Sequence, residues 1–144
     1  MSVAQILNAK GTAVMTAAPT DTVANVATTL ARKRIGSIVI VGPTGSIEGI
    51  VSERDVVRAI ASDGGDALSW PVMKIMTGQV KTCGPNDTEA ELMALMTEHR
   101  IRHLPVVQDG KLNGIISIGD VVKFRIEAIE REAAEMKSYI SSAG

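Results

Sequence analysis

The sequence predicts an α/β fold that contains two copies of one β-α-β-β-α unit, followed by an extended C-terminal helix. Three observations predict this fold. The chain repeats itself, each copy alternates between helically spaced apolar residues and short β-branched runs, and a heptad pattern continues beyond the second copy. We therefore divide the chain into a first repeat at residues 1–66, a second repeat at 67–125 and a C-terminal helical extension at 126–144.

The repeat has an offset of 66 residues in the first part of each unit and of 65 residues after it. The one-residue difference falls in a turn that reads Gly-Pro-Thr-Gly in the first copy and Gln-Asp-Gly-Lys in the second, where a change of length costs little. Two copies of so long a period favour a tandem duplication that closes one shared core. Matched positions include Asp21 with Asp87, Arg34 with Arg100, Gly49 with Gly114, Ser52 with Ser117 and Asp55 with Asp120.

Each copy is expected to begin with a short strand, at Val14–Ala17 and at Val80–Cys83. Asp21 and Asp87 then mark the start of an amphipathic helix, because apolar residues follow them with helical spacing. Two β-branched runs joined by a Gly-containing turn come next, which is typical of a β-hairpin. The hairpin strands are expected at Ser37–Val41 with Ile47–Val51 and at Leu104–Val107 with Leu112–Ile116, a linker at Asp63–Asp66, and a short helical turn from Trp70 to near Thr77.

Each hairpin leads into a second helix through a Ser-x-x-Asp segment, Ser52 to Asp55 in the first copy and Ser117 to Asp120 in the second. In a single copy the simplest explanation is helix capping, worth about 0.5–2 kcal/mol. Both copies, however, place the segment at the carboxyl end of an apolar strand, where α/β folds collect ligands. Backbone N–H groups at a helix start favour phosphate, and an ionised aspartate accepts hydrogen bonds from ribose hydroxyls.

Both copies resemble the CBS (cystathionine-β-synthase-type) motif over about Lys10 to Phe124. The resemblance rests on Gly49-Ile-Val-Ser-Glu-Arg-Asp55 and Gly114-Ile-Ile-Ser-Ile-Gly-Asp120, on Ile-Met-Thr77, and on His99-Arg-Ile-Arg-His-Leu-Pro-Val-Val107. It implies two units related by a pseudo-twofold axis, with two clefts between them. Ligands of such clefts are of the adenosine type: AMP, ADP, ATP, NAD(H) or S-adenosylmethionine. No metal is expected to be required.

By position, the resemblance implies that Asp55 and Asp120 hold ribose hydroxyls, helped by Ser52 and Ser117. Each cleft would take residues from both copies. The residues expected to face Asp120 are Lys10, Gly11, Val14, Ser37 and Ile38, and those expected to face Asp55 are Thr77, Val80, His103, Leu104 and Pro105. Phosphate contacts are expected from Arg54, Arg102 and His103.

The two copies differ in charge around these clefts. Arg54 has Gly119 as its counterpart in the second copy, and Arg102 has Gly36 as its counterpart in the first. Charge-assisted hydrogen bonds to phosphate are the stronger kind. We therefore expect the Asp55 cleft to be the occupied one, whereas the other, with Lys10 as its obvious cation, could bind weakly, bind a different ligand or stay empty.

Other residues that could carry chemistry have simpler explanations. His99 and His103 have the i, i+4 spacing of a metal pair, but the helix is expected to end near His99, and no carboxylate or cysteine completes a ligand set. Cys83 is expected to be a small buried strand residue and the methionines to fill gaps in the core. Arg32–Arg34, at a helix end, stays a secondary phosphate candidate.

The amino-acid composition excludes some classes of binding partner for this protein. Lys+Arg number 15 against Asp+Glu 16, so the net charge of −1 provides no positive field for nucleic acid or an acidic membrane surface. Trp70, Phe124 and Tyr139 are the only aromatic residues, too few for a base-stacking platform. A single cysteine, the lack of an export signal and the short apolar runs predict a cytoplasmic protein that does not span a membrane.

The C-terminal segment predicts a homodimer. Apolar residues recur there with the 4, 3, 4, 3, 4 spacing of a heptad seam, and the charged residues lie outside the seam. Because the repeat has its own core, we expect the seam to pack against a partner rather than back on its own module. The seam residues are Val122, Ile126, Ile129, Ala133, Met136 and Ile140.

The first functional hypothesis is a regulatory binding module that acts on an enzyme or transporter in trans. An adenine nucleotide would fill the Asp55 cleft, bridge the two copies and change their relative angle or the docking of the C-terminal helix. The alternative is a dimeric scaffold whose clefts are vestigial. A nucleotide-processing enzyme is disfavoured, because the sequence has no carboxylate cluster for a metal, no nucleophile with an adjacent base and no P-loop.

Overall fold

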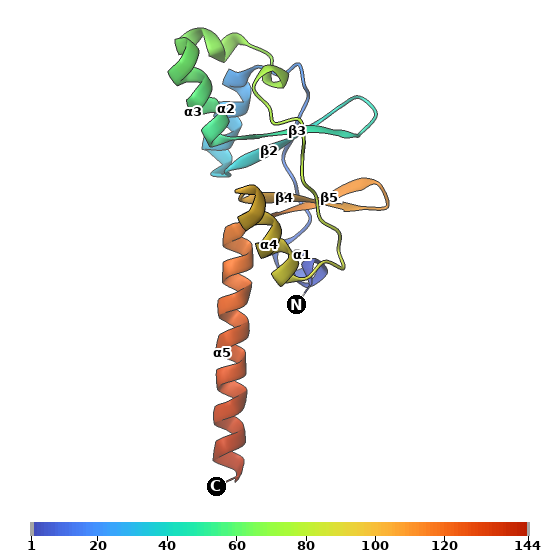
Figure 1. Cartoon of the computed structure of the whole chain (residues 1–144), viewed down its shortest axis with the longest axis vertical. Helices are drawn as coiled ribbons and strands as arrows, with labels where there is room; N and C mark the ends of the chain where they lie inside the picture. Colours follow the sequence, from blue (N-terminus) through green and yellow to red (C-terminus); the bar gives the residue numbers. More distant parts are fainter. Residues whose placement is uncertain (1, 144) are drawn as a thin grey trace.

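The computed structural model describes residues 2–143 and has the α/β architecture that the repeat predicts (Figure 1). Two β-hairpins lie one above the other with their turns pointing the same way, and a long helix leaves the body at its lower end. The first half contains α1 (Val3–Lys10), β1 (Thr16–Ala17), α2 (Val23–Lys33), β2 (Ser37–Val41), β3 (Ile47–Ser52) and α3 (Glu53–Asp63). The 3-10 helices η1 (Gly64–Ser69) and η2 (Val72–Lys74) lead to α4 (Glu89–His99), β4 (His103–Gln108), β5 (Lys111–Ser117) and α5 (Ile118–Ala143).

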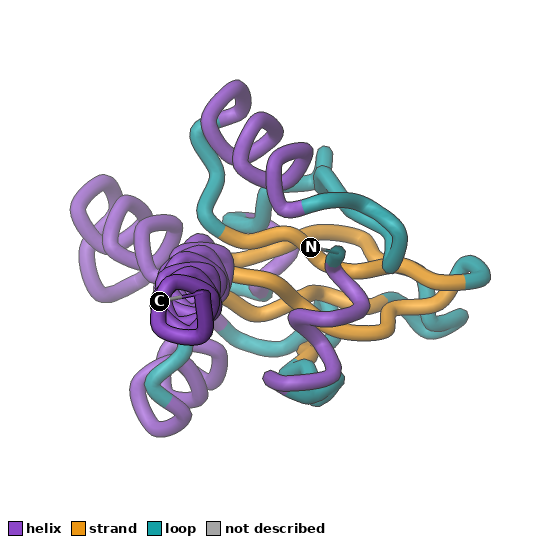
Figure 2. Tube along the Cα trace, turned by 90° about the horizontal axis from the view of Figure 1, so that it is seen from below, coloured by secondary structure: helices purple, strands orange, loops and turns teal. Residues whose placement is uncertain are grey.

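The strands form two small sheets that lie between the helices (Figure 2). β1 pairs in parallel with β2, and the hairpin pairs β2–β3 and β4–β5 are antiparallel. Each hairpin has one register shift, after Ile40 and after Val106, which are matched positions of the repeat. All four hairpin strands occur where the β-branched runs predict them, and their ends differ from the prediction by at most one residue.

The predicted first strand is present but shorter in the first copy, and it is reduced to a single bridge in the second. β1 keeps two of the expected residues, and in the second copy Cys83 pairs through a single parallel bridge to Val106. The Cys83 backbone N–H donates to the Pro105 carbonyl oxygen at 3.0 Å, and its carbonyl accepts from Val107 at 2.8 Å. Val80, which precedes the bridge, lies instead against a cavity described below, so this stretch does not extend the sheet.

Threonines rather than the preceding aspartates cap the first helix of each copy. The Thr22 and Thr88 hydroxyls accept hydrogen bonds from the backbone N–H three residues later, at 3.1 and 3.2 Å. Asp21 and Asp87 accept from the backbone N–H three residues earlier, at 3.0 and 2.8 Å, and so stabilise the turn that enters each helix. The helix that follows Thr88 ends at His99, as expected.

Each half of the molecule completes its hydrophobic core with a segment that precedes the other half. The sequence did not predict α1, which packs its apolar side chains among α4, β4, β5 and the start of α5. The residues around η2 pack in return among α2, β2, β3 and α3. The domain boundary at residue 66 stays a prediction, and the core packing crosses it in both directions. The exchanged side chains are Val3, Ile6 and Leu7 on one side and Trp70, Val72, Ile75 and Met76 on the other.

Matched glycines let the exchanged segments approach the sheets closely. Both segments have the pattern Val-x-x-Ile followed by a long apolar residue, Leu7 in α1 and Met76 after η2. A Cβ atom at Gly114 would lie 2.7 Å from Leu7 Cδ2, and one at Gly49 would lie 2.6 Å from Met76 Sδ. The reciprocal packing therefore depends on a glycine at the same position of β3 and β5.

α5 continues past the second half as one helix that extends away from the body (Figure 1). Within residues 2–143, no helix has both the length and the apolar character that a bilayer crossing requires.

Replacing Gly49 with alanine should destabilise the protein, because the new methyl group would lie 2.6 Å from Met76 Sδ and 2.9 Å from the Thr77 carbonyl oxygen. Overpacking of this kind costs about 1–3 kcal/mol. Urea denaturation followed by circular dichroism should show this loss in the free energy of unfolding. The matched control is Gly65→Ala, where no atom lies within 4 Å of the added carbon, and equal stabilities of the two variants would contradict the packing.

Candidate ligand-binding cavity

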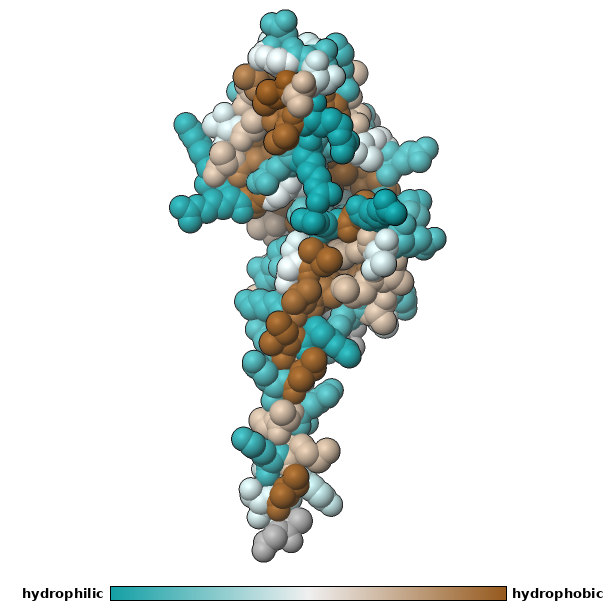
Figure 3. Space-filling view, turned by 60° about the vertical axis from the view of Figure 1, so that its left-hand side comes forward, coloured by the Kyte–Doolittle hydropathy of each residue, from teal (hydrophilic) through white to brown (hydrophobic). Residues whose placement is uncertain are grey.

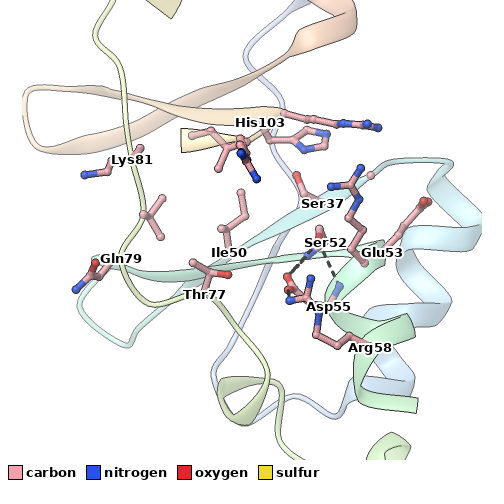
Figure 4. A pocket seen from close by; sticks show the side chains of 16 residues that line it. Ser37, Ile50, Ser52, Glu53, Asp55, Arg58, Thr77, Gln79, Lys81 and His103 are labelled. Carbon is pink, nitrogen blue, oxygen red and sulfur yellow. Dashed lines mark hydrogen bonds and ion pairs between the residues drawn. The ribbon is translucent and has the colours of Figure 1, made fainter. Parts of the chain in front are cut away.

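A cavity of about 360 Å³ lies between the two halves of the molecule (Figure 4). One wall comes from β2, β3 and the first turns of α3. The rest of the lining comes from the segment 77–81, from residues 100–102 between α4 and β4, and from His103 at the start of β4. The volume is in the range of small-molecule sites. The cavity is lined by Gly36, Ser37, Ile50, Ser52, Glu53, Arg54, Asp55, Arg58, Thr77, Gln79, Val80, Lys81, Arg100, Ile101, Arg102 and His103.

Asp55 is held in this cavity by a capping box with Ser52. Its Oδ2 accepts hydrogen bonds from the Ser52 backbone N–H at 2.8 Å and from Ser52 Oγ at 3.1 Å, while Ser52 Oγ accepts from the Asp55 backbone N–H at 3.3 Å. The Asp55 side chain is 14% exposed, and Arg58 Nη1 lies 3.9 Å from its Oδ1. These contacts orient the carboxylate and leave Oδ1 able to accept hydrogen bonds from a ligand.

Ser37 brings a buried hydroxyl to the same cavity. The residue is 6% exposed, and its Oγ has no hydrogen-bond partner within the described chain. A buried hydroxyl without a partner costs about 1–3 kcal/mol. A polar group of a bound molecule would satisfy it, so this position is an independent indication of a ligand.

Cationic side chains outnumber acidic ones around the cavity. The acidic residues are Glu53 and Asp55, and the cationic ones are Arg54, Arg58, Lys81, Arg100 and Arg102. This balance favours an anionic ligand, since opposite charges attract most strongly where water is partly excluded. Sequence reasoning missed Arg58, Lys81 and Arg100. Arg58 could have been found from its spacing of one helical turn from Arg54, whereas no local pattern indicates Lys81.

His103 forms the part of the wall where the two halves meet. A Cβ atom on Gly36 would lie 3.0 Å from the His103 ring, so the imidazole packs directly against the backbone of the first half. Burial, together with the nearby charges of Lys10 and Arg102, lowers the pKa of His103 below its ordinary value of 6.5, although Asp120 and Glu53 act in the opposite direction. The ring is therefore neutral at physiological pH.

The second aspartate has a different environment, although its capping box is the same. Asp120 Oδ2 accepts from the Ser117 backbone N–H at 2.8 Å and from Ser117 Oγ at 2.9 Å. It also accepts from Lys10 Nζ at 2.5 Å, and that ammonium group donates to the Ile115 carbonyl oxygen at 2.7 Å. Burial alone would raise the pKa of Asp120, but the hydrogen bonds from Lys10 and Ser117 and the charge of Lys10 hold it below its ordinary value. Lys10 thus neutralises the carboxylate from within the chain.

The structure brings most of the predicted Asp55 group together but divides the rest differently. Thr77, Val80, Arg54, Arg102 and His103 line the cavity with Asp55. Ser37 lies with Asp55 rather than facing Asp120, because it begins β2 at the point where β3 ends in Ser52. Leu104 and Pro105, predicted to face Asp55, are buried in the sheet and do not line this cavity. Of the residues predicted to face Asp120, Lys10 contacts its carboxylate, Ile38 is buried in the sheet, and Gly11 and Val14 lie in the chain between α1 and β1.

The other candidate residues contribute no second site among residues 2–143. No cluster of three or more His, Cys, Asp or Glu residues suited to a metal ion occurs there. Cys83 is buried, and burial together with the charge of Asp87 raises the pKa of its thiol to about 12. Its thiol is therefore protonated at neutral pH, which agrees with a packing role.

The fold and the cavity define a class: a module of two repeated α/β units whose shared cavity suits a small anionic ligand. The chain belongs to the CBS-domain family, because the family model for the CBS domain matches it twice, at residues 6–62 and 72–127. The first match lies within the first predicted repeat, and the second match covers most of the second repeat and ends two residues beyond it.

Solved structures and curated relatives agree with this assignment. A CBS-domain protein from Agrobacterium tumefaciens is 43% identical, with a TM-score of 0.84 and coverage of 86% of this chain and 92% of that chain. A CBS-domain protein from Pyrobaculum aerophilum, solved in complex with AMP, is 31% identical with a TM-score of 0.75, over 83% of this chain and 89% of that one. A mitochondrial CBS-domain protein from Arabidopsis thaliana is 36% identical over 83% of this chain, which spans 60% of that protein.

Replacing Lys10 with methionine should remove the charge that lowers the pKa of Asp120. A carboxyl group whose pKa is lower in the folded state than in the unfolded state, where it is 3.8, stabilises the protein at pH values above 3.8. That stabilisation is lost as the pH falls through the pKa of the folded state. We expect Lys10→Met to lose about 1 kcal/mol at pH 7 and to show a shallower loss between pH 5 and 2.

Denaturant unfolding at a series of pH values measures this effect, and Lys111→Met serves as a control because Lys111 has no ion pair in the described chain. The same acid dependence in both variants would contradict the role assigned to Lys10.

Proposed function

We propose that the chain is a regulatory module that binds one adenosine nucleotide, of the AMP, ADP, ATP or NAD(H) type, in the cavity beside Asp55. The observation that carries this proposal is the pairing of an oriented carboxylate with an excess of cationic side chains in one cavity between two repeats. The AMP complex of the Pyrobaculum relative supports the same ligand class. S-adenosylmethionine has a positive sulfonium centre and suits this cationic cavity less well.

The carboxylate side of the cavity fits a ribose. Vicinal hydroxyls are donors, and Asp55 Oδ1 is an acceptor whose position is set by the capping box. Ser37 adds a hydroxyl that can donate to or accept from the same ligand. A nucleoside bound here would complete hydrogen bonds that the chain leaves unmade.

The cationic side chains around the cavity fit phosphates. Arg54 and Arg58 come from α3, whereas Arg100 and Arg102 come from the other half of the molecule. Guanidinium groups bind phosphate through paired hydrogen bonds. A nucleotide in the cavity would therefore be held by both repeats at once.

The second cleft, which the family resemblance places beside Asp120, is proposed to bind the same ligand weakly or not at all. Lys10 already donates to the carboxylate that a ribose would need. A ligand there would have to replace a charge-assisted hydrogen bond, which is stronger than a neutral one. We therefore expect one nucleotide per chain.

Contact with both repeats is also what makes regulation possible. A ligand shifts a conformational equilibrium only by its difference in affinity between the two states. Occupancy of the cavity would favour the arrangement in which both walls reach the ligand, and an enzyme or transporter could respond to that arrangement. In this proposal the chain binds nucleotide without turning it over and acts in the cytoplasm. A dimeric scaffold with vestigial clefts is the competing function, and it requires that no nucleotide bind.

Asp55→Asn should abolish or strongly weaken nucleotide binding, while Asp120→Asn should leave it nearly unchanged. The two aspartates occupy matched positions with the same capping box, so both variants test the same structural change. Losing one charged acceptor should lower affinity for AMP or ATP by about 10- to 100-fold. Isothermal titration calorimetry with AMP, ADP, ATP and NADH measures this. Wild-type protein that binds none of them would favour the scaffold, and equal affinities of the two variants would refute the role of Asp55.

Arg100→Ala should weaken binding of ATP more than binding of adenosine, because Arg100 is one of the cationic residues that line the cavity. Arg34→Ala is a matched control: both arginines end the first helix of their repeat in the left-handed conformation with a φ of 53°, but Arg34 does not line this cavity. We expect an ATP affinity about tenfold lower for Arg100→Ala and a smaller difference at high salt. An equal loss in the two variants would show that Arg100 acts only through general electrostatics.

A further inference from the structure

The outer part of α5 presents an apolar stripe that the rest of the described chain does not cover (Figure 3). Val122, Ile126, Ile129, Met136 and Ile140 are between 44% and 64% exposed. Only the start of the helix packs on the body, against α1, α4 and β5. The stripe follows the heptad seam predicted from the sequence, and it does not pack back on its own module within the described chain.

The heptad positions of the stripe are defined by its spacing. Val122, Ile129 and Met136 are at d, and Ile126, Ala133 and Ile140 are at a. A strict a and d stripe is the pattern of a helix that packs along one other helix, whereas a helix on a globular body has a wider apolar face. The pattern therefore favours a single long helix as the occupant.

The flanking charges select a second copy of α5 in parallel orientation. In a parallel pair, each g residue faces the e residue of the next heptad in the partner. Arg125 at g then faces Glu130 at e, and Glu132 at g faces Lys137 at e. Both contacts join opposite charges. Because the dimer would be twofold symmetric, each contact would occur twice.

The antiparallel arrangement brings like charges together instead. In an antiparallel pair, e residues face e residues of the partner helix, and g residues face g residues. When all a and d layers are matched, Glu130 faces the Glu130 of the other copy, Glu132 faces its Glu132, and Lys123 faces its Lys137. Like charges that face each other destabilise the pair. The charges also argue against a membrane surface, because residues 122–140 contain four basic and four acidic side chains rather than a basic face.

The stripe continues into an apolar groove at the base of the helix. This groove is lined by Ala90 and Met93 of α4 and by Val121, Val122 and Ile126 of α5. Arg125, at the rim, lies 3.7 Å from Glu89 of α4. The groove and the stripe thus form one continuous apolar surface, which a helix parallel to α5 can cover from its first turn.

We propose that two copies of the chain associate through α5 as a parallel, in-register coiled coil whose first layers lie in the groove between α4 and α5. The interface places the two modules side by side at the same end of the dimer. It goes beyond the nucleotide site and does not depend on it.

Ala133→Glu and Ala134→Glu test the seam with the same substitution at neighbouring helical positions. Ala133 is at a, so two glutamates would meet in the middle of the interface, whereas Ala134 is at b and lies outside it. Sedimentation velocity of the full chain should show a dimer at micromolar concentration for wild type and Ala134→Glu. For Ala133→Glu the dissociation constant should rise at least tenfold. A monomeric wild type, or a dimer that Ala133→Glu leaves intact, would overturn the proposal.

Lys137→Glu tests the orientation. It should weaken a parallel dimer, because Glu132 of one helix would then face a glutamate in the other, and the double variant Glu132→Lys/Lys137→Glu should restore the association. In an antiparallel dimer the single variant would instead strengthen association by pairing with Lys123. A tighter dimer for Lys137→Glu would therefore overturn the parallel assignment. Calorimetry with ATP on each variant measures nucleotide binding separately. The ATP affinity should stay unchanged even in variants that no longer dimerise.

Discussion

The structure depends on the reciprocal exchange of short apolar segments between the two repeats. α1 fills the core of the second half and the residues around η2 fill the core of the first, so neither half has a complete core on its own. Because each exchanged segment must cross from one half to the other, the two halves are held against each other. The cavity between them is therefore built into the fold, and both of its walls can contact one ligand.

Duplication produced two equivalent backbones, but their side chains have diverged. Ser52 with Asp55 and Ser117 with Asp120 form the same capping box, so both carboxylates have the same local geometry. The two carboxylates differ in the side chain that the segment exchanged from the other half places beside them. Lys10 reaches Asp120, whereas no lysine of the other exchanged segment contacts Asp55 in the described chain. One carboxylate is thus neutralised from within and the other is available to a ligand.

α5 links the second repeat to the surface beyond the module. Its N-terminal end is capped by Ser117 and carries Asp120, its first turns pack beside α1, and the rest forms the exposed stripe. A change in the packing of α1 would act on the same helix that carries the stripe. This continuity is a physical route between the repeats and the outer surface, because a helix moves largely as a rigid element.

The sequence by itself determined those structural features that depend on residues close together in the chain. The four hairpin strands, the capping boxes at Ser52 and Ser117, the end of α4 at His99 and the heptad spacing of α5 all follow from local pattern, since turns, caps and periodicity involve residues a few positions apart. The family resemblance already implied that Lys10 faces Asp120. Tertiary structure alone decided the direct contact between the Lys10 ammonium group and that carboxylate, the exchange of α1 and the place of Ser37 beside Asp55. These features join residues far apart in the chain, so they depend on how the completed elements pack.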